Sequence, residues 1–359
     1  MGSGTSGSDL PLPWIETPLI PSVPLSKEVG CNIFLKLENL QPSGSFKSRG
    51  VGNMMFRAAA DCPPEESERI HFYCSSEGNA GLACATTAAT LQCKATIVVP
   101  LSAPVIIEDK LKRLGAEVVR FGKNWSEADA HLRLELLANH DPTGRAVYVP
   151  PFDHPDIWTG AATMVDEVIA QMKGARIDGI VCSVGGGGLV NGVMEGLERN
   201  NLTDTQVLAV ETIGADSLNA SVKAGEHVTL PGITSIAASL GACRVSEKTY
   251  EWATRSDTKL ISATVTDAQA AFACARFADD ARFLVEVACG ATFATAYNGN
   301  LRRYFGGASS VSDEEWKTRN VVLIVCGGNN TNLQTMDHYR SRYHLGVDRG
   351  EKKMARERG

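Results

Sequence analysis

Short apolar, β-branched runs alternate along the chain with longer stretches in which apolar residues recur every three or four positions. The short runs predict strands at residues 31–38, 69–75, 95–100, 117–122, 179–184, 206–212 and 320–326. The longer stretches predict helices near 48–60, 80–91, 105–114, 126–139, 157–173, 189–199, 267–277 and 288–304. Such alternation is typical of parallel strands joined by crossover helices. We therefore expect an α/β fold of open, doubly wound sheets, which bind ligands beyond the carboxyl ends of their strands.

The chain of 359 residues is long enough for two packed cores. Residues 147–158 concentrate prolines, which favour extended backbone and stop neighbouring helices. Before them, residues 50–146 hold about three strand–helix pairs. We predict a small domain at 50–147, a discontinuous large domain at 1–49 and 148–345, and a charged, disordered tail at 346–359.

Composition and charge narrow the classes of partner. The net charge of −6 offers no basic field for nucleic acid. The start of the chain lacks a basic and apolar leader, and no apolar run reaches the length that crosses a bilayer. The ten cysteines are dispersed, and Cys182 and Cys326 lie inside apolar runs, which favours a reducing compartment. We expect a cytoplasmic protein that binds neither nucleic acid nor membranes.

Three glycine-rich turns follow predicted strands, at residues 75–81, 183–192 and 326–331. In the second, Gly185 to Gly188 let backbone N–H groups approach a ligand, and the next helix directs the positive end of its dipole there. No Lys-Ser/Thr pair follows, and the G-x-G-x-x-G pattern is incomplete, so neither a Walker A loop nor a dinucleotide fingerprint is indicated. A phosphate cradle is the favoured interpretation and a flexible turn the alternative.

Lys47 lies in GSFKSRG, residues 44–50, where a helix is predicted to begin. The helix dipole and desolvation would lower the pKa of its amine there, whereas a lysine taken alone is more often a surface residue. A reactive lysine and a phosphate cradle are the parts that pyridoxal 5′-phosphate requires. The sequence has no H-E-x-x-H or G-x-S-x-G pattern, and Ser45 stands two residues before Lys47, not the three of S-x-x-K. These absences disfavour zinc and serine hydrolases.

Five motifs resemble, in the same order, the serine/threonine dehydratases of pyridoxal-phosphate fold-type II. They lie at residues 42–50, 75–81, 149–153, 183–189 and 325–329, and the similarity runs from about residue 15 to 340. It is strongest to eukaryotic, fungal-type L-serine dehydratases. The resemblance implies a tryptophan-synthase-β-like fold with the active site between two domains, a homodimer, and α,β-elimination of L-serine or L-threonine to ammonia and pyruvate or 2-oxobutanoate.

The resemblance also implies residue roles. Lys47 would form a Schiff base with the cofactor and remove the substrate α-proton. The other implied cofactor contacts are Phe46 on the ring, Asn79 at O3′, Cys326 at the pyridine nitrogen, and Gly185, Gly186, Gly187 and Gly188 at the phosphate. The substrate carboxylate would meet Ser76, Asn79 and Ala80. A monovalent cation, with K⁺ as the candidate, would lie beside Glu211, Ala215, Ser217, Leu240 and Ala242.

Two positions depart from the family pattern. Glu77 stands where dehydratases have alanine or glycine and related racemases have serine. As a second acid/base it would suit a β-replacement enzyme or an amino-acid racemase; otherwise it shapes the pocket only. A carboxylate there also disfavours substrates with a second negative charge. Val287 replaces a proline and is interpreted as a local backbone change.

Overall fold

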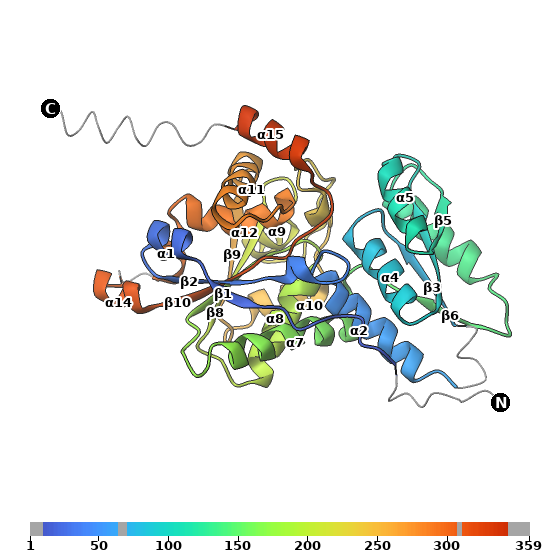
Figure 1. The fold of residues 1–359 in the computed structure, drawn as a ribbon, viewed down its shortest axis with the longest axis horizontal. Coiled ribbons are helices and arrows are strands. Elements are labelled where there is room, and N and C mark those ends of the chain that lie inside the picture. Colours follow the sequence, from blue (N-terminus) through green and yellow to red (C-terminus); the bar gives the residue numbers. More distant parts are fainter. Residues whose placement is uncertain (1–9, 64–69, 307–310, 344–359) are drawn as a thin grey trace.

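The computed structural model describes residues 10–63, 70–306 and 311–343. They form two lobes, each built around its own sheet (Figure 1). The larger sheet has the spatial order β1 (Leu19–Pro21), β2 (Asn32–Lys36), β10 (Asn320–Ile324), β7 (Gly179–Ser183), β8 (Gln206–Thr212) and β9 (Leu260–Val265). The smaller sheet has the order β5 (Glu117–Arg120), β4 (Lys94–Val99), β3 (Ile70–Ser75) and β6 (Arg145–Tyr148). Only β1 runs antiparallel to its neighbour among these strands.

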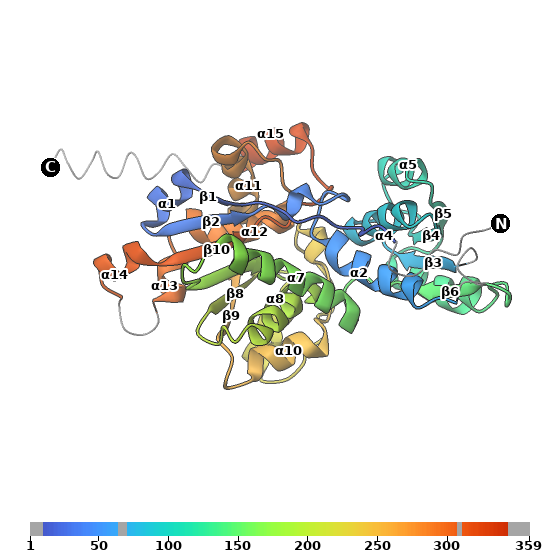
Figure 2. The same ribbon diagram turned by 60° about the horizontal axis from the view of Figure 1, so that its bottom comes forward.

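Helices cover both faces of the larger sheet (Figure 2). The large lobe contains α1 (Val23–Val29), α7 (Pro155–Gln171), α8 (Gly188–Arg199), α9 (Ser217–Ala224), α10 (Glu247–Thr254), α11 (Asp267–Ala281), α12 (Val287–Tyr297), α13 (Leu301–Phe305), α14 (Asp313–Thr318), α15 (Leu333–Arg342) and the 3₁₀ turns η1 (Glu38–Leu40) and η3 (Ala238–Leu240). The small lobe contains α4 (Asn79–Thr90), α5 (Val105–Arg113), α6 (Trp125–His131) and the π-helical η2 (Leu132–Leu137). Within the described ranges, no helix has the length and apolar character needed to span a membrane.

The helix α2 (Lys47–Ala60) joins the two lobes, and its residues divide between them. Val51 and Met55 belong to the hydrophobic core of the small lobe, together with Ile157 from α7. The α2 and α7 backbones pack closely, since a Cβ at Gly160 would lie 2.5 Å from the carbonyl oxygen of Arg49. The helix that begins with Lys47 is therefore fixed between the core of the small lobe and α7.

The predicted α/β fold with two sheets is confirmed, and all seven predicted strands form. The prediction of one helix over 288–304 is wrong, because α12 ends before Gly299, whose φ of 76° is left-handed, and α13 begins after it. The strands β1, β6 and β9 were not predicted, because their residues are mostly half-buried or exposed and give no continuous apolar run. The predicted tail at 346–359 lies outside the described residues.

Candidate active site between the lobes

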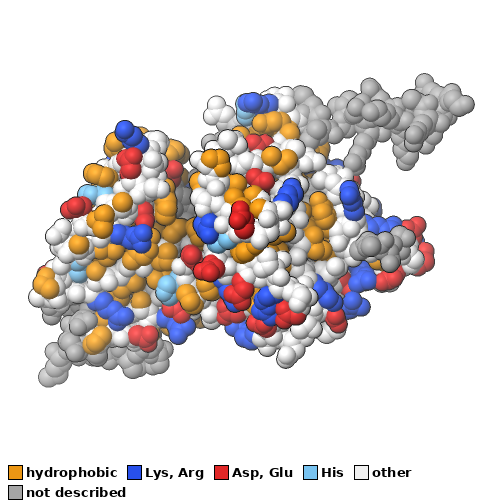
Figure 3. Space-filling model, turned by 180° about the vertical axis from the view of Figure 1, so that it is seen from behind, with side chains coloured by type: hydrophobic (Ala, Val, Ile, Leu, Met, Phe, Trp, Pro, Cys, Tyr) orange, Lys and Arg blue, Asp and Glu red, His pale blue; other side chains and the backbone are white. Residues whose placement is uncertain are grey.

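The predicted site residues gather where strands of both sheets end. Turns after β3, β7, β8 and β10 carry Ser76, the glycine cradle, Ala215 and Cys326, respectively. The space-filling view shows a hollow between the two lobes (Figure 3). Ligand sites in open α/β sheets lie beyond the carboxyl ends of the strands, so these turns are where chemistry is expected.

Lys47 is held at the end of β10 by the chain that precedes it. The N–H of Phe46 donates to the carbonyl of Cys326 at 3.1 Å, and Ser45 forms an antiparallel bridge with Gly327. The amine of Lys47 donates to the carbonyl of Pro151 at 2.5 Å and lies 5.3 Å from the centre of the Phe46 ring. Phe46 thus lies beside the amine, and its packing on the cofactor ring stays a prediction.

The amine of Lys47 has a lowered pKa, which favours its nucleophilic form. Desolvation lowers its pKa to about 8, although negative charge on Cys74, Glu286 and Cys326 would act in the opposite direction. At neutral to mildly alkaline pH a substantial fraction of the amine is therefore unprotonated. A free amine is the form that attacks an aldehyde or removes a proton from carbon.

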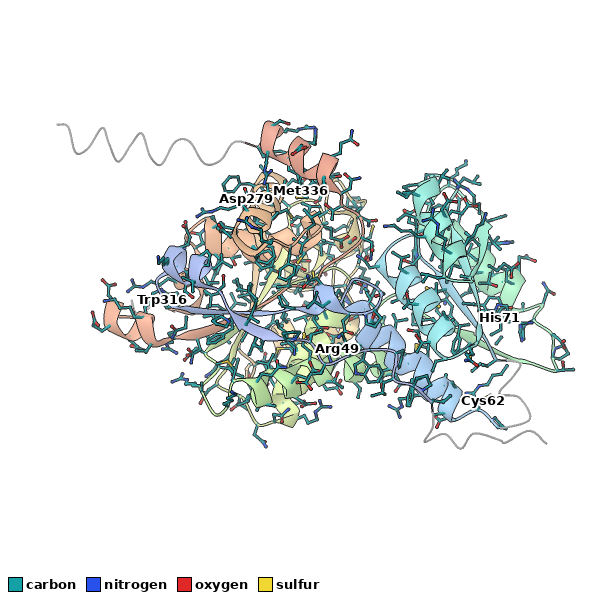
Figure 4. All side chains as sticks on the ribbon, viewed as in Figure 1. Arg49, Cys62, His71, Asp279, Trp316 and Met336 are labelled. Carbon is teal, nitrogen blue, oxygen red and sulfur yellow. The ribbon has the colours of Figure 1, made fainter. Side chains whose placement is uncertain are left out.

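Arg49, two residues after Lys47, anchors the first turn of α2 in the large lobe (Figure 4). Its guanidinium donates to both carboxylate oxygens of Glu38, at 2.7 and 2.8 Å, and to both of Glu167, at 2.6 Å each. Lys36 adds a bond of 2.6 Å to Glu167. The Arg49 and Glu38 side chains are 1% and 0% exposed. Such bidentate pairs fix geometry more tightly than single contacts, so the position of Lys47 is built in before any ligand binds.

The tetraglycine turn between β7 and α8 has room for no side chain. A Cβ at Gly186 would lie 2.4 Å from the Phe152 ring, and one at Gly187, whose φ is 102°, would lie 1.8 Å from the hydroxyl oxygen of Thr249. In the described part of the chain, the N–H groups from Gly185 through Leu189 donate no hydrogen bond. Free amides at a helix N-terminus bind phosphate, so this turn fits the phosphate of pyridoxal 5′-phosphate.

The turn after β3 leads into α4 and offers a second anion site. α4 begins at Asn79 without a side-chain cap. The N–H groups of Asn79, Ala80 and Gly81 donate no hydrogen bond to any described residue. A Cβ at Gly81 would lie 2.1 Å from the carbonyl oxygen of Ser76, so this turn folds tightly onto α4. The free amides suit a carboxylate.

A buried polar cluster connects this turn to the lysine. The side-chain oxygen of Asn79 accepts from the backbone N–H of Asn329 at 3.0 Å, and the Asn329 amide donates to the carbonyl of Ser43 at 2.8 Å. The Asn79 amide in turn donates to Glu286 at 2.8 Å. Burial raises the pKa of Glu286 to about 7, although hydrogen bonds and the nearby charge of Lys47 act in the opposite direction. Asn79 therefore links the turn after β3 in the small lobe to two segments of the large lobe, one after β10 and one before α12.

Glu286 is a site residue that the sequence predictions missed. It stands alone among apolar residues in LVEVACGA, residues 284–291, and such an isolated acid in an apolar run is the signal that could have found it. Buried carboxyl groups need partners, which for this one lie in the active site.

Cys326 and Glu77 occupy contrasting environments. Cys326 is buried at the end of β10, with its sulfur 3.5 Å from the hydroxyl of Ser183 at the end of β7. Glu77 is exposed and makes no hydrogen bond or ion pair within the described residues, while partial desolvation raises its pKa. Cys326 therefore lies near the glycine turn that follows β7, whereas no predicted site residue in the described ranges forms a hydrogen bond or ion pair with the Glu77 carboxylate.

The predicted cation positions lie next to the cradle, since a Cβ at Gly185 would be 3.1 Å from the Cα of Leu240. Glu211 is fully buried and accepts from two backbone N–H groups, of Leu218 and Asn219, at 2.9 and 2.8 Å. Burial raises its pKa to about 8. The buried hydroxyl of Ser217 lacks a partner among described residues. Ala215 and Leu240 are buried, and Ala242 is half-buried.

Comparison with known proteins places these features in a family. Residues 11–327 match the family model described as pyridoxal-phosphate dependent enzyme. The catabolic L-serine/threonine dehydratase of Saccharomyces cerevisiae is 37% identical over 317 residues, 86% of each chain. A human serine dehydratase-like protein is 42% identical over 332 residues, 92% of this chain and 95% of the relative. The solved structure of a fungal L-serine ammonia-lyase from Rhizomucor miehei is 36% identical with a TM-score of 0.82, covering 92% of this chain and 99% of the other.

The chain belongs to the family of pyridoxal-phosphate dependent enzymes. The predicted resemblance is thereby confirmed, and with it the fold-type II architecture and the cofactor. The enclosed amine of Lys47 and the free amides of the glycine turn fit that cofactor on their own chemistry.

Proposed function

We propose that this protein is a pyridoxal-phosphate-dependent ammonia-lyase that converts L-serine and L-threonine to ammonia and pyruvate or 2-oxobutanoate. One observation carries the proposal: the enclosed Lys47 amine, of lowered pKa, bonds to Pro151, whose neighbour Phe152 packs on the glycine turn, and its charge interacts with Glu286, the partner of Asn79 at the start of α4. Both turns carry amide donors that are unpaired among the described residues. One turn suits a phosphate and the other a carboxylate. Relatives that match most of this chain are named as serine or serine/threonine dehydratases, which supports this reaction class.

The bound cofactor supplies an aldehyde for the amine and a ring that accepts the electron pair released at the substrate α-carbon. The protein's own groups then divide the work. The first-turn amides of α4 and Ser76 hold the α-carboxylate, and Asn79 fixes the start of that helix. The Lys47 amine receives the α-proton. Cys326 would contact the ring nitrogen, and a cysteine side chain there would not hold that nitrogen protonated as a carboxylate would. This would favour loss of the β-hydroxyl over transamination.

We also propose a K⁺ ion beside the phosphate turn. Its first ligand is Glu211, since a buried carboxyl with a raised pKa regains its charge when a cation binds. The unpartnered Ser217 hydroxyl supports a ligand at that point. A cytoplasmic homodimer is proposed on the family resemblance, with domain boundaries as predicted at 50–147. The separate four-stranded sheet is consistent with that division.

The test is reduction of the holoenzyme with borohydride followed by peptide mapping, alongside an assay for 2-oxo acid release from serine. We expect a pyridoxyl group on Lys47, and its loss in Lys47→Ala with at least a ~10³-fold fall in activity. The exposed Lys123→Ala is the control and should retain both label and activity. A label on another residue, or oxo-acid release by Lys47→Ala at the wild-type rate, would refute the proposal.

A further inference from the structure

Trp125 contacts the turn to which the proposed function assigns the substrate carboxylate. It is the first residue of α6, and its indole N–H donates to the carbonyl oxygen of Ser75 at 2.8 Å. Ser75 is the last residue of β3. The hydrogen bond therefore acts at the carboxyl end of the small sheet, where the turn toward α4 begins.

This hydrogen bond fixes one peptide plane. In a trans peptide the carbonyl and the following N–H point in opposite directions, and the described backbone has no cis bonds. Holding the Ser75 oxygen toward Trp125 therefore turns the N–H of Ser76 away from it. That N–H donates no hydrogen bond to the described residues. It remains an oriented, unused donor in the same turn as the free amides of α4.

The exposure of Trp125 argues against a packing role. Its side chain is 46% exposed, whereas Trp316 is 3% exposed and makes a similar bond, from its indole N–H to the carbonyl of Val29 at 2.9 Å. Trp316 lies at the far end of the large lobe from the small lobe (Figure 4). Trp125 belongs to none of the hydrophobic clusters of the described residues, and its hydrogen bond to Ser75 is the specific contact that it makes.

We infer that Trp125 is a positioning residue for substrate. Its indole N–H orients the peptide between Ser75 and Ser76, so that the Ser76 N–H joins the first-turn amides of α4 in holding the α-carboxylate. This role rests on the proposed function and adds a residue whose importance no sequence motif indicated. It concerns the carboxylate alone and leaves the amine and the leaving group unaffected.

The test compares two ligands that differ only in the carboxylate. L-Alanine has the carboxylate but no β-leaving group, and ethylamine is the same amine without the carboxylate. Both are titrated into wild-type and Trp125→Phe holoenzyme while the cofactor absorbance is followed. We expect Trp125→Phe to weaken L-alanine binding ~3- to 10-fold and to leave ethylamine binding within ~twofold. The KM for serine should rise by the same factor as the L-alanine Kd, with kcat within ~twofold.

Trp316→Phe is the matched control, because it removes the same kind of bond away from the site. It should lower the melting temperature and change neither ligand affinity. Equal weakening of L-alanine and ethylamine by Trp125→Phe, or no weakening of L-alanine, would overturn the inference. If wild-type enzyme binds L-alanine but releases no oxo acid from serine, the proposed function fails while the role of Trp125 is still decided by the titrations.

Discussion

The two sides of the candidate site are held in place by different forces. On the large-lobe side, Arg49 forms ion pairs with the carboxylates of Glu38 and Glu167, and its side chain is 1% exposed. On the small-lobe side, hydrogen bonds hold the turn after β3, from Trp125 to Ser75 and between Asn79 and its partners Glu286 and Asn329. The same turn carries the exposed Glu77. The lysine and phosphate side is thus preorganised at the cost of burying charges. On the carboxylate side Glu77 is exposed, whereas Asn79 and Ala80 at the start of α4 are buried. The free amides there are the part that a substrate completes.

The largest expected effect comes from breaking the buried ion cluster. Arg49→Met leaves Glu38 buried without its cation, and we expect the free energy of unfolding to fall by about 3–5 kcal/mol. Chemical denaturation of the apoprotein measures it. The control is Arg57→Met, which removes an ion pair between Arg57 and Asp156 whose side chains are 53% and 27% exposed, and it should cost less than about 1 kcal/mol. Equal losses of unfolding free energy in the two variants would show that the buried cluster stabilises the fold no more than an exposed ion pair does.

The second prediction concerns the pH dependence of cofactor uptake by the apoprotein. With a Lys47 pKa of about 8, the unprotonated fraction of the attacking amine rises with pH and approaches one only above that value. The uptake rate should therefore rise by about tenfold per pH unit well below pH 8 and level off above it, as stopped-flow absorbance would show. Glu286→Gln removes a charge that raises this pKa, so its midpoint should move to lower pH. A midpoint near the ordinary lysine value of 10.5 would contradict the desolvation of this amine.

The smallest effect is expected at Glu77. Because Glu77 is exposed and its carboxylate forms no hydrogen bond or ion pair with a described residue, Glu77→Gln should change kcat/KM for serine by less than about threefold. Recovered serine should contain no D-isomer in either protein. Glu135→Gln, at another exposed position on the small lobe, serves as the control. A hundredfold loss, or D-serine that depends on Glu77, would favour the racemase alternative and show that the small-lobe side of the site also does acid/base chemistry.

The sequence predicted those parts of the molecule whose signals are local. Strands such as β7 and β10 are buried almost throughout and appear as continuous apolar runs. The glycine turn and Lys47 were likewise found from neighbouring residues. By contrast, β6 has four half-buried residues beside a proline-rich segment and gives no clear pattern.

Site residues whose roles depend on distant partners were not found. Glu286 binds Asn79 across 207 positions of sequence, and Arg49 binds Glu167 across 118. Trp125 reaches Ser75 from a helix 50 residues away. No periodicity or motif encodes such contacts, because they arise only when the sheets and helices have packed. The tertiary structure was needed to find them.

The course of α2 limits how such a protein can be recombined. Arg49 ties the start of this helix to the large lobe. Within the next two helical turns, Val51 and Met55 already belong to the core of the small lobe. Ile157 of α7 belongs to that same core. The lobes are consequently not interchangeable modules. A chimaera that takes its smaller half from a relative must bring both helices with it, or match their buried faces, if it is to keep a reactive lysine.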